Sequence, residues 1–134
     1  MKIKNVLIIE WLVRLALSAS FLSAVADRFE LWPKDISTWG NWYNFVQYTQ
    51  NLLYFIPPQW GIWAAYIATS LEIILGVLLL IPFKTKWVAN TSGFLLLSFA
   101  ISMLISLGLK PCLDYSVFTA IGASFALGLI TKNH

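Results

Sequence analysis

The chain has 134 residues, of which 59% are hydrophobic and 11% are charged, and its mean hydropathy is +0.74. Soluble domains carry about a quarter charged residues, so this composition excludes a water-soluble globular domain and indicates one membrane domain. The net charge of +3 is small and dispersed. Because no basic stripe interleaves with aromatic residues, the sequence argues against nucleic acid as a partner.

Four segments are long and apolar enough to cross a hydrocarbon core of about 30 Å, which takes about 20 helical residues. They are residues 6–26, 60–81, 87–109 and 113–130. Prolines lie in the gaps, and Asp114 after Pro111 is suited to cap the fourth helix. The predicted fold class is all-α, an integral membrane four-helix bundle in a single transmembrane domain, residues 1–134. Glu10 and Arg14 argue against reading the first span as a cleaved secretory signal.

The connection between the first two spans, residues 27–59, is long and rich in aromatic side chains. Apolar positions from Trp39 and Trp42 onward follow helical spacing, which predicts an additional external helix in the membrane interface. This segment either forms a lid over the bundle or only anchors its aromatics at headgroup level.

The basic residues that flank the spans are unequally divided between the two sides of the membrane. One side has five and the other has three: Lys2, Lys4, Lys84, Lys86 and Lys132 against Arg28, Lys34 and Lys110. Under the positive-inside rule this excess predicts that both termini are cytoplasmic.

Three ionisable residues, Glu10, Arg14 and Glu72, lie well inside the predicted spans, where each is costly unless paired or hydrated. Glu10 and Arg14 are four residues apart and share a helix face. Counted from the predicted helix ends, Arg14 and Glu72 lie at matching depths in antiparallel helices. The sequence therefore predicts one buried Glu10–Arg14–Glu72 cluster, which either fixes helix register or binds a ligand or proton.

Small residues recur at every fourth position in the first and fourth spans, and a glycine follows Glu72 by one turn. Such residues let helix backbones approach closely, within one chain or between protomers. The predicted packing positions are Ala16, Ser20, Ala24, Gly76, Ser116, Ala120, Ser124 and Gly128.

The chain has a single cysteine, Cys112, and a single histidine, His134. One cysteine cannot form an intrachain disulfide, and one histidine cannot hold a haem between two imidazoles. We therefore expect no cofactor bound covalently or by metal ligation, and no metal site.

Several motifs occur in a distinctive order: Arg14 in an apolar helix, SAVADRF at 23–29, WGNW at 39–42, Glu72 with Gly76, and LDYSVF at 113–118. In this order they resemble the DoxX family of small bacterial membrane proteins. The resemblance implies four transmembrane helices in the bacterial inner membrane and an association with membrane redox complexes, including a thiosulfate to quinone oxidoreductase. The candidates for ligand or proton binding are then the predicted cluster with Trp39, Trp42, Asp114 and Tyr115.

Three functions fit these expectations. The first is a redox-associated membrane subunit that binds quinone or another apolar small molecule beside a membrane redox partner protein, without a redox centre of its own. The second is a non-catalytic scaffold or homo-oligomer packed through small residues. The third is a small proton-coupled transporter or lipid-binding protein. An enzymatic activity is neither indicated nor excluded.

Overall fold

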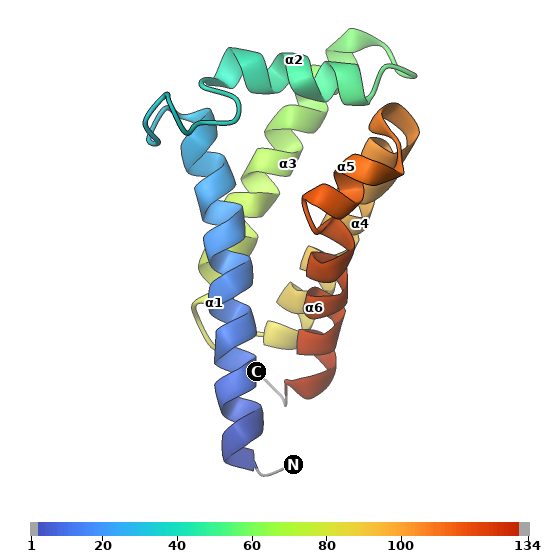
Figure 1. The fold of residues 1–134 in the computed structure, drawn as a ribbon. Coiled ribbons are helices and arrows are strands. Elements are labelled where there is room, and N and C mark those ends of the chain that lie inside the picture. Colours follow the sequence, from blue (N-terminus) through green and yellow to red (C-terminus); the bar gives the residue numbers. More distant parts are fainter. Residues whose placement is uncertain (1–2, 132–134) are drawn as a thin grey trace.

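The computed structural model describes residues 3–131, and in this range all regular structure is helical. The helices are α1 (Ile3–Arg28), α2 (Trp42–Leu52), α3 (Pro58–Leu79), α4 (Thr85–Leu107), α5 (Leu109–Asp114) and α6 (Val117–Ile130). Helices α1, α3, α4 and α6 form a bundle, and α2 lies across one end of it (Figure 1). The predicted all-α membrane bundle with an additional interfacial helix is confirmed.

Three helices, α1, α3 and α4, are long and apolar enough to cross a membrane, whereas α6 is a shorter apolar helix of 14 residues. The predicted fourth span, 113–130, is interrupted. Ser116 has a left-handed backbone with φ of +56°, which breaks the run of helical hydrogen bonds between α5 and α6. Asp114 is therefore the last residue of α5 rather than the cap of a long helix, and it pairs with Lys110 at 2.9 Å on the surface.

Helix α2 occupies part of the segment for which an interfacial helix is predicted. Asn41 caps it, because its side-chain oxygen accepts a hydrogen bond of 2.9 Å from the Asn44 amide. The helix crosses α3 at Gly61, where an added Cβ would lie 2.9 Å from the Gln50 side chain. The absence of a side chain at Gly61 thus lets α2 rest closely on α3.

The hydrophobic core lies in the half of the bundle away from α2. It joins four helices through one cluster of buried residues: Leu17, Phe21, Leu75, Leu79, Val88, Ala89 and Leu127. In this half α1 crosses α3 at Gly76, whose carbonyl oxygen accepts a 2.7 Å hydrogen bond from the Ser18 hydroxyl. The helices are therefore in close contact at this end.

The predicted packing stripes do not all lie at helix contacts. Ser124 and Gly128 are buried within the chain, where a Cβ on Gly128 would strike the Asn90 side chain of α4. Ala16 is exposed, and Ser116 lies at the break between α5 and α6. The remaining members of the stripes, Ser20, Ala24 and Ala120, border a cavity.

Candidate functional site

The charged centre of the bundle is the pair formed by Arg28, the last residue of α1, and Glu72 of α3. Arg28 Nη1 lies 2.8 Å from Glu72 Oε1 and donates a 2.8 Å hydrogen bond to Thr69 Oγ1. Arg28 and Glu72 are 3% and 2% exposed. Because buried charges are costly unless they are paired, each of these residues fixes the position of the other.

Aromatic rings cover the Arg28 guanidinium on the side of α2. Its Cζ lies 3.7 Å from the centroid of the Phe45 ring and 5.0 Å from that of the Trp39 ring. The two rings meet edge to face, with centroids 5.0 Å apart. Cation–π attraction, which strengthens away from water, thus holds α2 and the preceding loop against the end of α1.

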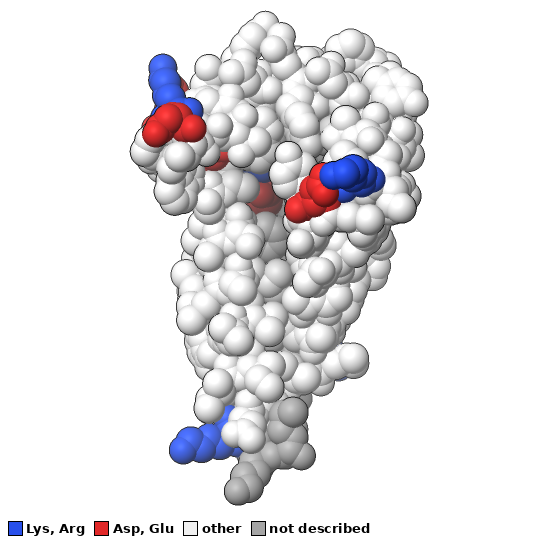
Figure 2. Space-filling view, in the orientation of Figure 1, with Lys and Arg blue, Asp and Glu red and all other residues white. Residues whose placement is uncertain are grey.

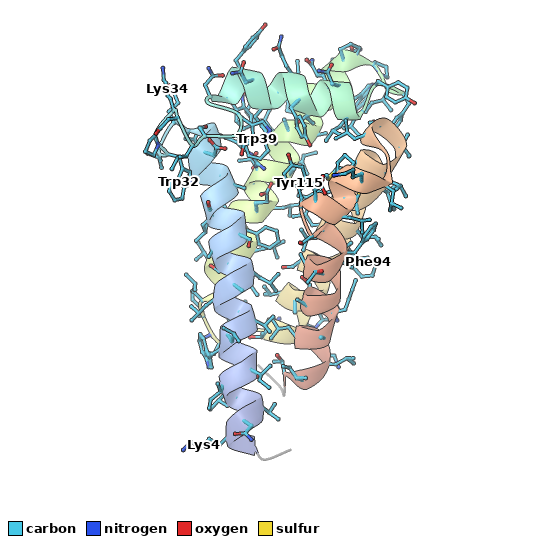
Figure 3. All side chains as sticks on the ribbon, in the orientation of Figure 1. Lys4, Trp32, Lys34, Trp39, Phe94 and Tyr115 are labelled. Atoms are coloured by element: carbon cyan, nitrogen blue, oxygen red, sulfur yellow. The ribbon has the colours of Figure 1, made fainter. Side chains whose placement is uncertain are left out.

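Asp27 fixes the loop that carries Trp39. Its carboxylate accepts hydrogen bonds from the Ser37 hydroxyl, from the Thr38 amide at 2.8 Å and from the Trp39 amide at 3.3 Å. Asp27 is 6% exposed, so these bonds are shielded from water. The indole of Trp39 therefore lies in a fixed place beneath the start of α2 (Figure 3).

A cavity of about 590 Å³ lies under α2 and between the helices. Its walls are mostly apolar, and Arg28 and Glu72 are its charged lining residues. Tyr48 contributes a phenol from α2. Burial raises the pKa of this phenol, with smaller contributions from Tyr115 and Cys112, so the group is a neutral hydroxyl at ordinary pH. Small-molecule sites have this volume and this composition, with apolar walls and a few convergent polar groups.

Two buried N–H donors around this cavity, Arg28 Nε and Trp39 Nε1, make no hydrogen bond within the part of the chain that the structure describes. The Glu72 carboxylate lies beside them and is engaged by Arg28 Nη1 at 2.8 Å. Because buried polar groups normally have partners, this set is suited to a ligand with a polar head group.

Arg14 belongs to a separate group at the level of the α3–α4 turn. It is fully buried and donates hydrogen bonds of 2.5 Å to Thr85 Oγ1 and to the Ile81 carbonyl oxygen. Glu10 Oε2 lies 3.6 Å from Arg14 Nη1, and the guanidinium lies 4.4 Å from the centroid of the Trp11 ring. These contacts join α1 to the turn that leads into α4.

The prediction of a single Glu10–Arg14–Glu72 cluster is therefore wrong. Glu10 and Arg14 do pair, but the Ser18–Gly76 hydrogen bond sets the register of α1 on α3, which puts Arg14 beside Ile81. Glu72 lies near the far end of α1, beside Arg28. The apolar pattern ends the first predicted span at Ala26, which puts Arg28 on the external flank. A signal was present, since Arg28 follows Arg14 by 14 residues, about four helical turns, on the same face.

The other candidate residues lie away from the Arg28–Glu72 pair. Trp42 stacks on Phe29 with ring centroids 5.7 Å apart and does not line the cavity. Asp114 is exposed beside Lys110, and Tyr115 is 68% exposed at the α5–α6 junction, labelled in Figure 3. Among the predicted candidates, Trp39 and Glu72 are the two that line the cavity.

The fold and the site define the class: a small, all-helical membrane protein with an apolar cavity closed on one side by an interfacial helix. Residues 6–113 match the model of the family described as Methylamine utilisation protein MauE. This match runs from α1 nearly to the end of α5, so the chain belongs to that family. The family assignment corrects the resemblance to DoxX. No curated protein and no solved structure matches the chain.

Proposed function

We propose that this protein acts in methylamine utilisation by binding a membrane-dissolved small molecule of the quinone class in the cavity beneath α2. Membership of the family supports the process. The observation that supports the ligand class is the pair of buried N–H donors without partners in the described chain, Arg28 Nε and Trp39 Nε1, beside the Glu72 carboxylate. They belong to residues that line a cavity of about 590 Å³ with otherwise mostly apolar walls.

The chemistry of a quinone head group fits this set. Its carbonyl oxygens can accept hydrogen bonds from the Arg28 Nε and Trp39 Nε1 N–H groups, and in the reduced form a hydroxyl can donate to the Glu72 carboxylate. The ring and tail lie against the apolar walls, which include Phe21, Leu71 and Met103. Such a ligand supplies partners for the buried polar atoms and removes apolar surface from lipid and water.

We also infer a bacterial inner-membrane location with both termini cytoplasmic. Arg28 is buried at the ion pair, so it no longer counts as a flanking charge on the side of α2, where Lys34 and Lys110 remain. Lys4 marks the opposite end of the bundle, and Lys34 lies near α2 (Figure 3). Lys84 caps α4 and Lys86 lies in its first turn, at the same end of the bundle as Lys4, whereas Lys2 and Lys132 lie outside the described residues.

The first experiment titrates a short-tailed ubiquinone into the purified protein in lipid nanodiscs and follows quenching of tryptophan fluorescence. The variant Arg28→Met/Glu72→Leu replaces the whole ion pair with apolar side chains. Because a buried pair can be exchanged as a unit with little loss of stability, this variant is expected to fold. It is expected to bind the quinone about ten- to a hundredfold more weakly, since hydrogen bonds to charged groups are lost.

Glu10→Gln is the matched control, because it alters a buried carboxylate of α1 that does not line the cavity. Its quinone affinity is expected to equal that of the wild type. A quinone affinity of the double variant equal to that of the wild type would show that Arg28 and Glu72 do not bind the quinone. No quinone in native lipid extracts of the wild type, together with no binding in nanodiscs, would contradict the proposal.

A growth experiment tests the process. A host that lacks this protein is expected to grow poorly with methylamine as its nitrogen source and normally with ammonium. The wild-type chain is expected to restore growth on methylamine, whereas Arg28→Met/Glu72→Leu is not. Full restoration of growth by the double variant, at equal membrane abundance, would show that the Arg28–Glu72 pair in the cavity is not needed for methylamine utilisation.

A further inference from the structure

Helix α2 closes the cavity on the side of the external loops. Its buried residues Phe45 and Thr49 line the cavity from above, and the Ser106 hydroxyl of α4 donates a hydrogen bond to the Leu52 carbonyl oxygen at the end of α2. At the other end of α2, the Asp27 carboxylate holds the preceding loop. A ligand that approached from the water above α2 would have to break these contacts.

The bundle is less tightly closed between α1 and α6. These helices share the core cluster through Leu17, Phe21 and Leu127. Between that cluster and α2, Ala24 of α1 and Ala120 of α6 line the cavity with small side chains, and Ser20 lines it at the level of Phe21. Figure 1 shows α1 and α6 diverging toward the end that α2 covers. Small side chains on diverging helices leave room between them.

The space-filling view shows the result. Red and blue atoms are visible at the back of a recess between the upper part of α1 and the α5–α6 junction (Figure 2). The charged residues that line the cavity are Arg28 and Glu72. The recess therefore leads from the side of the bundle toward the ion pair.

We propose that the slot between the upper halves of α1 and α6, bordered by Ser20, Ala24 and Ala120, is the opening through which a ligand dissolved in the bilayer reaches the cavity. This inference rests on the proposed function, and it deepens it by specifying that the ligand comes from the lipid phase. Helix α1 is long and apolar enough to span the membrane, so lipid flanks the slot beside it. Helix α2 separates the cavity from the external aqueous phase. A larger side chain at the border closes the slot.

The test uses a cysteine inside the cavity rather than the natural ligand. Thr49→Cys is made in a Cys112→Ala background, because Thr49 is buried on the cavity side of α2 and Cys112 is the sole native cysteine. The protein in lipid nanodiscs is treated with N-phenylmaleimide, which partitions into lipid, or with a sulfonated maleimide, which stays in water. The lipid-soluble reagent is expected to alkylate the cysteine much faster.

Closing the slot gives the decisive comparison. Adding Ala24→Phe is expected to slow alkylation by at least about tenfold, because the reagent must then displace a ring at an overpacking cost. Ala16→Phe is the matched control, since Ala16 is exposed on the same helix and does not line the cavity. Ala120→Phe closes the opposite border and serves if Ala24→Phe fails to fold, with exposed Ala126→Phe as its control.

Unchanged alkylation rates in folded Ala24→Phe and Ala120→Phe would overturn the inference and indicate another opening, such as one near Ser98 between α3 and α4. Faster labelling by the sulfonated reagent would overturn it in favour of a route past α2. The readout is independent of quinone. If the slot variants slow alkylation but the wild type binds no quinone, the proposed function fails while the opening stands.

Discussion

The two buried arginines of α1 lie on one helix face and have different surroundings. Arg14 donates to Thr85 and Ile81 where the helices are closely packed, whereas Arg28 borders a cavity and contacts two aromatic rings. Both leave Nε without a hydrogen bond within the described chain, but Arg14 does not line the cavity. The position of Arg14 fits a structural role, and that of Arg28 fits the binding role proposed for it.

Replacing Arg14 tests the structural role. Arg14→Met is expected to lower the free energy of unfolding by about 3–5 kcal/mol, because it removes one partner of a buried ion pair. Thr85→Val, which removes only one acceptor of Arg14, is expected to cost about 1 kcal/mol. Reversible unfolding in mixed detergent micelles measures both. An Arg14→Met protein as stable as the wild type would show that the Glu10–Arg14–Thr85 group does not support the fold.

At the residue scale the sequence predicts contacts along one helix better than contacts between helices. The Glu10–Arg14 pair follows from a spacing of four residues. The partner of Glu72 depends instead on the register between α1 and α3, which the Ser18–Gly76 contact sets. Because Arg14 and Arg28 share one face of α1, a register counted from the predicted helix ends selects Arg14 in place of Arg28.

Among the helices, the contact of α6 with α4 depends on a residue without a side chain. A Cβ on Gly128 would strike Asn90, and one on Gly93 of α4 would lie 2.7 Å from the Phe125 ring of α6. In contrast, a Cβ on Gly122 would meet nothing within 4 Å. Helix α6 therefore carries one glycine that its packing requires and one that it does not.

The glycine pair of α6 gives a matched prediction. Gly128→Ala is expected to destabilise the protein by about 1–3 kcal/mol through overpacking. Gly122→Ala is expected to be neutral or to stabilise it by up to about 1 kcal/mol, since alanine favours helix. Thermal unfolding in detergent distinguishes the two. Asn90→Ala should partly rescue Gly128→Ala, and equal stability of the two glycine variants would contradict the packing of α6 on α4.

Helix boundaries were predictable where proline determines them. Pro58 begins α3, and Pro82 follows its end. Pro111 is different, because it lies in the first turn of α5, where proline is tolerated, and does not separate two helices. The break that does occur, at Ser116, has no proline or glycine signal in the sequence beside it. The sequence therefore does not predict a separate, short α5.

The whole molecule has a closely packed half around the core cluster and a hollow half beneath α2. The pattern of apolar and polar residues predicts the bundle but does not distinguish its packed half from its hollow half, because lipid-facing and cavity-facing positions are both apolar. The same limitation explains the DoxX interpretation. Apolar helices resemble one another across families, and most of the LDYSVF motif lies beyond the residues, 6–113, that match the MauE family.

Orientation is tested on the intact chain. In a Cys112→Ala background, Lys34→Cys is expected to react with a membrane-impermeant maleimide on spheroplasts, because Lys34 is exposed near α2. Lys84→Cys, at the opposite end, is expected to react only after the membrane is permeabilised. The reverse pattern would place the termini outside and invert the proposed topology.

The hollow half has a consequence for the lipid around it. Because the core fills one end of the bundle and the cavity the other, one leaflet borders closely packed helices and the other borders the hollow half. Lateral pressure from the acyl chains of the leaflet beside α2 would act on the proposed slot. On the proposed route, the composition of that single leaflet would therefore set how readily the cavity exchanges its contents.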